Sequence, residues 1–138
     1  MSAEPRMTGR THDAVRAALR ADGAFEVVLG LVLITGPATG LLDSLDLPSP
    51  ASDGLVVGFG ALLLPFAVAL WVWAARQRPQ AGPLGLLAAI NAVTGLVLAV
   101  WIVARSGDAP AGGVAFVLAV AAVLLALGLA QTRLRAAD

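Results

Sequence analysis

Four long apolar blocks, separated by short polar connections, dominate this sequence of 138 residues. They cover about residues 23–42, 54–75, 83–104 and 112–131, and nearly all of the charged residues lie outside them. A helix needs about 20 apolar residues to cross the hydrocarbon core of a bilayer, so each block is long enough to span a membrane. The blocks therefore predict an all-α integral membrane protein, a four-helix bundle that runs up-down-up-down.

The composition favours the same class of protein. Hydrophobic residues make up 59% of the chain and charged residues 13%, whereas a soluble domain carries about 25% charged residues. The mean hydropathy is +0.87. Four spans use most of the chain, so residues 1–138 are predicted to form a single transmembrane domain.

The polar segments around the blocks predict local structure. Residues 1–21 form a basic arm, in which Thr11 is placed to cap an interfacial helix that leads into the first span. The first span is predicted to end near Pro37, and a short surface helix is expected over residues 41–47. The connections after the second and third blocks are short, so successive spans should be antiparallel neighbours.

Arginines are distributed unevenly among these polar segments. In an up-down-up-down arrangement, one side of the membrane has Arg105 as its only arginine, together with several aspartates. The arginines on the opposite side are Arg6, Arg10, Arg16, Arg20, Arg76, Arg78, Arg133 and Arg135. Since positive residues are concentrated on the cytoplasmic side of membrane proteins, both termini are predicted to be cytoplasmic. All basic residues being arginine, beside abundant alanine, favours a bacterial source and hence the bacterial inner membrane.

Two carboxylates lie close to the start of the first block. Asp22 and Glu26 are one helical turn apart, so they share a face near the cytoplasmic boundary. Two close carboxylates do not both ionise cheaply in a poor dielectric, and such a pair can share a proton or hold a cation. The alternative is structural: Asp22 lies in the headgroup layer, and Glu26 pairs with Arg20, Arg76 or Arg78. The sequence leaves both alternatives open.

Small residues recur at alternating spacings of three and four in every block, which predicts one packing face for each helix. The face of the first block contains Gly23, Glu26, Gly30, Leu33, Pro37 and Gly40. The other faces are Gly54, Gly58, Ala61 and Pro65; Leu84, Ala88, Asn91, Gly95 and Leu98; and Gly112, Ala115, Ala119, Ala122 and Ala126. Two GxxxG motifs, at residues 36–40 and 54–58, predict that the first two spans are closest at their outer ends. The glycines predicted to pack against a neighbouring helix are Gly30, Gly36, Gly40, Gly54, Gly58 and Gly95.

Two further residues inside the blocks, Pro65 and Asn91, are predicted to shape the helices and their contacts. Pro65 leaves the carbonyl of Ala61 without its helical donor and should kink the second helix. Asn91 is the amide within the third block and is expected to make a helix-to-helix hydrogen bond, with that carbonyl as a plausible acceptor. Asp22, Glu26 and Asn91 are together the candidate intramembrane polar site.

Enzyme signatures are missing from the sequence. There is no Cys and only His12 as histidine, so neither a thiolate nor a multi-histidine metal site is expected. No Gly-rich phosphate loop or nucleophile with a neighbouring base is present. We therefore predict no catalytic residues, no metal and no cofactor. The basic arm lacks interleaved aromatic residues, which favours anionic lipid over nucleic acid as its partner.

Two family resemblances follow from these residues. Four spans with Glu26 in the first resemble the small multidrug-resistance exporters, but the third span lacks their aromatic-rich lining. The first helix, with Arg20, Gly23, Gly30 and Pro37, resembles that of DoxX-like four-helix bacterial membrane proteins. The second resemblance implies a fold and no site.

These observations support two hypotheses of function. The first is a non-enzymatic accessory protein of the inner membrane that binds lipids, further copies of itself or another membrane protein. The alternative is a proton-coupled transporter of small hydrophobic or cationic compounds that uses Glu26. A sealed core of small residues favours the first hypothesis, and a cavity that reaches Glu26 favours the second.

Overall fold

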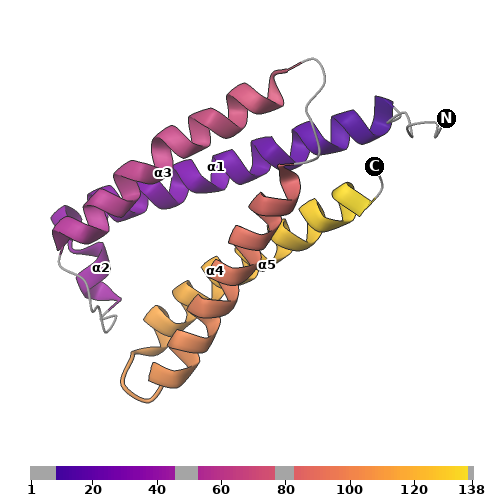
Figure 1. Cartoon of the computed structure of the whole chain (residues 1–138). Helices are drawn as coiled ribbons and strands as arrows, with labels where there is room; N and C mark the ends of the chain where they lie inside the picture. The colour runs from indigo at the N-terminus through magenta and orange to yellow at the C-terminus, as the bar shows by residue number, and fades with distance from the viewer. Residues whose placement is uncertain (1–8, 46–52, 77–82, 137–138) are drawn as a thin grey trace.

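The computed structural model describes residues 9–45, 53–76 and 83–136, and this part of the chain is all-helical with no strand. The helices are α1 (Gly9–Thr39), α2 (Leu41–Ser44), α3 (Asp53–Ala74), α4 (Leu84–Arg105) and α5 (Ala111–Ala136). Successive long helices run in opposite directions (Figure 1). By length and composition, α3, α4 and α5 are each long and apolar enough to cross a membrane. An all-α membrane protein was predicted, and the helical content and these three helices agree with it.

Helix α1 combines the predicted arm helix and the predicted first span in one helix of 31 residues. At 1.5 Å per residue it is about 46 Å long, against about 33 Å for the 22 residues of α3. Its first turns are not a separate surface helix, because Val15 and Leu19 are fully buried there. They form an apolar cluster with four residues of α3 and α4: Leu70, Ala74, Leu84 and Leu87. The described part of the arm therefore contributes Val15 and Leu19 to the core.

The end of α1 differs slightly from the prediction. Pro37 lies inside the helix, which continues to Thr39, and the chain turns at Gly40. Gly40 has a φ of 69°, in the left-handed region that glycine adopts without a steric penalty. The predicted surface helix follows as α2, which ends at Ser44. Residue 47, its predicted end, lies outside the described residues.

The four long helices form two pairs, α1 with α3 and α4 with α5 (Figure 1). Glycines bring the backbones of each pair into contact. An added Cβ on Gly60 of α3 would lie 2.8 Å from the carbonyl oxygen of Gly30 in α1. An added Cβ on Gly95 of α4 would lie 2.9 Å from the carbonyl oxygen of Ala121 in α5, and one on Gly128 would lie 2.9 Å from that of Ala88. Such contacts between membrane helices need small residues, because packing holds the helices together.

The packing faces of α3 and α5 are not the predicted ones. On α3 the predicted face (Gly54, Gly58, Ala61 and Pro65) is exposed. Its buried residues are Gly60, Ala67, Leu70 and Ala74. On α5 the predicted face (Gly112, Ala115, Ala119, Ala122 and Ala126) is exposed as well. Its buried residues are Gly113, Val117, Ala121, Leu124, Gly128 and Gln131. Both helices are rotated from the predicted orientation, because small residues at helical spacing occur on more than one of their faces.

Three predicted glycine contacts are also corrected. No atom lies within 4 Å of a Cβ added to Gly58 or to Gly40, so neither glycine holds α3 against α1. Gly36 contacts Leu42 of α2 and not α3. The predicted faces of α1 and α4 agree better with the structure, since Gly23, Gly30 and Gly95 are buried there.

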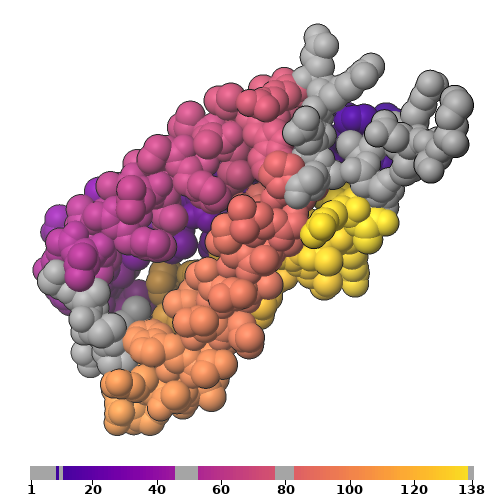
Figure 2. Space-filling model, in the orientation of Figure 1, coloured from indigo at the N-terminus to yellow at the C-terminus, as the bar shows by residue number. Residues whose placement is uncertain are grey.

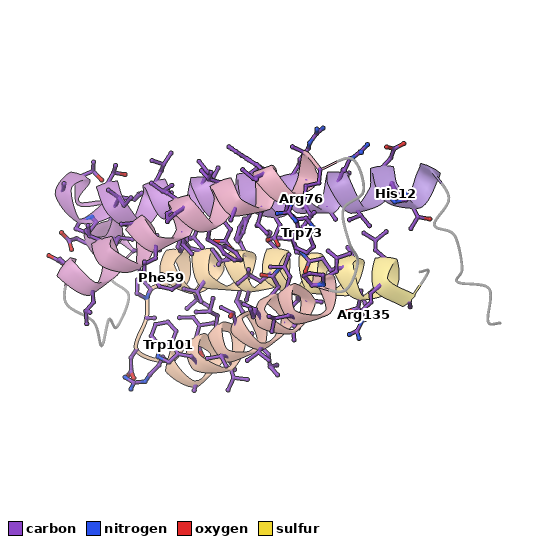
Figure 3. All side chains as sticks on the ribbon, turned by 45° about the horizontal axis from the view of Figure 1, so that its top comes forward. His12, Phe59, Trp73, Arg76, Trp101 and Arg135 are labelled. Carbon is purple, nitrogen blue, oxygen red and sulfur yellow. The ribbon has the colours of Figure 1, made fainter. Side chains whose placement is uncertain are left out.

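The two pairs approach each other at one end and separate toward the other. The start of α1 and the end of α5 lie at the same end of the molecule (Figure 1), and α1 also contacts α5. Toward the opposite end, the space-filling view shows an opening between the α1–α3 pair and the α4–α5 pair (Figure 2). His12, Arg76 and Arg135 lie at the closed end, and Phe59 and Trp101 at the open end (Figure 3). The closed end is also where polar side chains are buried.

Candidate functional site

Asp22 is the centre of a buried polar cluster that joins three helices. It lies on α1 and is fully buried. Its Oδ2 accepts hydrogen bonds from Asn91 Nδ2 of α4 at 3.1 Å and from Gln131 Nε2 of α5 at 2.7 Å. Asn91 Nδ2 also lies 3.2 Å from Gln131 Oε1, so the three side chains are mutually bonded. The cluster therefore fastens the α4–α5 pair to α1 where the two pairs meet.

The structural alternative for Asp22 placed its carboxylate in the headgroup layer, and this depth in a membrane stays a prediction. The carboxylate is shielded because α1 continues past the apolar block, and α4 and α5 cover this side of it. A buried polar group is costly unless it is hydrogen-bonded, and the two amides provide those bonds on one of its oxygens. The other oxygen, Oδ1, is buried and has no hydrogen-bond partner.

Glu26 lies one turn further along α1, in the direction in which the two pairs separate. Its side chain is only 6% exposed, and Oε2 is buried without a hydrogen-bond partner. The predicted pairing with an arginine is not found. Arg20 and Arg76 are exposed, and no ion pair to Glu26 occurs within residues 9–45, 53–76 and 83–136. Arg78, the third predicted partner, lies outside the described residues. Asp22 and Glu26 thus present two buried carboxyl oxygens that lack donors.

Asn91 makes a helix-to-helix hydrogen bond, but not to the predicted acceptor. Its amide donates to Asp22 and Gln131 rather than to the carbonyl of Ala61. Ala61 and Pro65 lie on the exposed face of α3, and α3 continues through Pro65 without a break. The rotation of α3 explains the correction, since it carries the freed carbonyl away from α4.

Gln131 is a site residue that the sequence reasoning missed. It is fully buried, although it stands two residues before Arg133 at the end of the last apolar block. A signal for it was present: Gly128 and Gln131 continue the spacing of Ala121 and Leu124, so these four residues lie on one face. That face was overlooked because the alanines of the neighbouring face fit the same spacing.

An apolar hollow of about 190 Å³ opens between α1 and α5, next to this cluster. Its walls are Phe25, Val28, Leu29 and Val32 of α1 and Phe116, Ala119, Val120 and Val123 of α5. Asp22, Glu26, Leu29 and Leu33 lie on one side of α1, because their spacings are four, three and four residues. Leu29 lines this hollow, and Leu33 lines a wider hollow of about 630 Å³ beside the start of α3. Neither hollow is lined by Asp22 or Glu26, and the unpartnered oxygens of both residues are enclosed by protein. The hollow between α1 and α5 is called the crevice below.

Asp22 Oδ1 and Glu26 Oε2 are buried without a partner. A carboxyl oxygen accepts hydrogen bonds when ionised, and a protonated carboxyl also donates one. In the described part of the chain, no group of three or more His, Cys, Asp or Glu side chains is close enough to hold a metal ion. The buried polar cluster and the apolar hollow between α1 and α5 are therefore two separate features of the site.

Comparisons of the chain with protein-family models, with curated proteins and with solved structures found no match.

Proposed function

We propose that this chain is a multi-pass protein of the bacterial inner membrane that binds a lipid-like molecule in the crevice and has no enzymatic activity of its own. Helices α3, α4 and α5 have the length and composition of membrane spans. In this proposal the apolar part of α1 also crosses the membrane, which makes four spans, because it packs along α3 through Gly30 and Gly60. The resemblance of the first helix to DoxX-like proteins is compatible with this architecture.

The charges at the two ends support an orientation with both termini in the cytoplasm. At the closed end, the described arginine side chains are Arg16, Arg20, Arg76, Arg133 and Arg135. At the open end the described charged side chains are Arg105, Asp43, Asp53 and Asp108. The positive-inside rule then places the closed end at the cytoplasmic surface. The opening between the two helix pairs then faces the outer half of the bilayer.

The observation that carries the proposal is the apolar lining of the crevice. Its walls are aliphatic and aromatic side chains of α1 and α5. Lipid tails are as apolar as leucine, so an acyl chain supplies matching contacts for these walls.

The test is photo-crosslinking of the purified protein with a phospholipid that carries a diazirine on one acyl chain. Crosslinks are expected on α1 and α5, at residues of the hollow. Ala119→Trp fills the hollow and should reduce crosslinking at least about tenfold, since overfilled sites exclude their ligand. Ala122→Trp is the matched control on the exposed surface of the same helix and should crosslink like the parent. Crosslinks spread evenly over all four helices would contradict the proposal.

A second candidate function is proton-coupled transport, which the unpartnered Glu26 carboxyl favours. Transport requires Glu26 to exchange a proton for a substrate, and Glu26→Gln keeps the shape while it removes the titration. Under this alternative, protein in proteoliposomes releases protons when substrate is added and the variant does not. Binding without proton release supports the accessory function instead.

Orientation is tested with single cysteines, since the chain has none of its own. Ser44→Cys and Ser106→Cys should react with an impermeant thiol reagent outside intact cells, and Ala136→Cys should not. Labelling of Ala136→Cys alone would reverse the proposed orientation.

A further inference from the structure

Asp22 and Glu26 each have one carboxyl oxygen that is buried and has no hydrogen-bond partner. These oxygens are Asp22 Oδ1 and Glu26 Oε2. The two residues are one turn apart on the same side of α1, and residues at this spacing have Cβ atoms about 5–6 Å apart. They are close enough for the charge of Asp22 to act on Glu26. Protein encloses both oxygens, so the nearest candidate partner of each carboxyl is the other carboxyl.

No cation enters this part of the core. Among the side chains that the structure describes, Asp22 and Glu26 are the only buried ones that can carry a charge. Arg16 is directed to Asp13 and to the carbonyl oxygen of Arg76, and His12 lies more than two turns before Asp22 on α1. The other described arginines of the neighbouring helices are exposed: Arg20, Arg76, Arg105, Arg133 and Arg135. The two carboxyls therefore face each other's charge without compensation.

A single proton gives both oxygens a partner. An ionised carboxyl only accepts hydrogen bonds, whereas a protonated carboxyl also donates one. Asp22 Oδ2 already accepts from the amides of Asn91 and Gln131, which is the role of an ionised carboxylate. Glu26 makes no such bonds through Oε2, so it is the better carrier of the proton. A bond from a protonated to an ionised carboxyl is charge-assisted, and such bonds are about twice as strong as neutral ones.

We infer that Asp22 and Glu26 share one proton, which Glu26 Oε2 donates to Asp22 Oδ1, and that this proton keeps the two helix pairs joined at the closed end. Asn91 and Gln131 reach the other oxygen of Asp22 from α4 and α5. When the proton is lost, two negative charges lie one turn apart in an enclosed site. The contact between the pairs then has to open and admit water, because a buried charge without a partner is costly. This inference does not depend on a ligand in the crevice.

The first experiment is infrared spectroscopy of the purified full-length protein in dodecyl maltoside, a detergent without a carbonyl group. A protonated carboxyl has a C=O band that an ionised carboxylate lacks and that shifts in D2O. At about pH 7, carboxyls with ordinary pKa values of about 4 are ionised, so the parent should show this band with the intensity of one proton per molecule. No band, or the intensity of two protons, would overturn the inference. This measurement does not depend on the folding of a variant.

Variants then identify the groups that hold the proton. Glu26→Gln should remove the band, and Asp43→Asn, which replaces an exposed acid of α2, should retain it. Asp22→Asn keeps Glu26 but removes the negative charge that accepts its proton. In this variant the band should disappear at a pH at least about one unit lower than in the parent. Loss at the same pH would show that burial alone keeps the proton on Glu26 and would overturn the sharing.

The second experiment tests the contact between the helix pairs through the pH dependence of Tm. Above about pH 5 the unfolded chain has lost the proton that the folded parent still holds, so the stability of the parent should fall as the pH rises. Each pH unit should lower its equilibrium constant of folding about tenfold until the infrared band is lost. Glu26→Gln should lack this decrease, since its amide can donate to Asp22 at every pH. An equal pH dependence of Tm in the parent and in Glu26→Gln would overturn the role of the proton at this contact.

Discussion

Replacing Gly60 with alanine tests the contact that holds α1 against α3. The added Cβ would lie 2.8 Å from the carbonyl oxygen of Gly30 and 2.9 Å from Cβ of Leu33, whereas ordinary contacts of a Cβ begin at 3.4 Å. The first neighbour is backbone and cannot move by a side-chain rotation, so the two helices must separate by about half an ångström. Overfilling a packed contact in this way costs about 1–3 kcal/mol.

The same substitution at Gly58 is the matched control. No atom lies within 4 Å of its added Cβ, and it stands two residues away in the same helix. Both variants gain about 1 kcal/mol from the higher helix propensity of alanine, so this term cancels in their difference. Gly60→Ala should therefore be about 1–3 kcal/mol less stable than Gly58→Ala.

The assay is far-ultraviolet circular dichroism while SDS is titrated into the protein in dodecyl maltoside. The free energies of unfolding of both variants and the parent are compared. Equal values would refute the close contact between Gly30 and Gly60. A larger loss for Gly58→Ala would restore the packing face that the sequence predicted.

Three further predictions use the same unfolding assay. Asn91→Leu and Gln131→Leu should each lower the free energy of unfolding by about 1–3 kcal/mol, because each leaves a buried partner unsatisfied. The double variant should lose less than the sum of the two single losses, and strict additivity would contradict a shared cluster. Ala121→Leu should lower the free energy of unfolding by about 1–3 kcal/mol, because it overfills the contact between α4 and α5, while Ala122→Leu should leave it unchanged. A larger loss for Ala122→Leu than for Ala121→Leu would show that α5 is rotated. Glu26→Gln should be at least as stable as the parent, since it removes a buried carboxyl that has no donor; a loss above about 1 kcal/mol would reveal a stabilising partner.

The sequence determined the helices and their order. Apolar blocks of sufficient length can satisfy their backbone hydrogen bonds in a membrane only as helices or closed barrels, and their boundaries follow from charged residues, glycines and prolines. The described bounds of α3, Asp53–Ala74, and of α4, Leu84–Arg105, differ by one residue at each end from the predicted 54–75 and 83–104. Asp22, Glu26 and Asn91 were selected as candidates because polar residues near apolar blocks are few.

The tertiary structure decided which face of each helix is buried. On α4 the predicted face was found because Asn91 marks it, and a polar side chain avoids lipid. On α3 and α5 no such residue within the block was used as a marker, and alanines and glycines fit the required spacing on several faces. Lipid tails are as apolar as leucine, so hydrophobicity does not distinguish the buried face from the exposed face of a membrane helix. On α3 and α5 the face is selected by close contacts in the tertiary structure, such as Gly60 with Gly30 and Ala121 with Gly95. The tertiary structure also brings Gln131 to Asp22 from the other end of the chain.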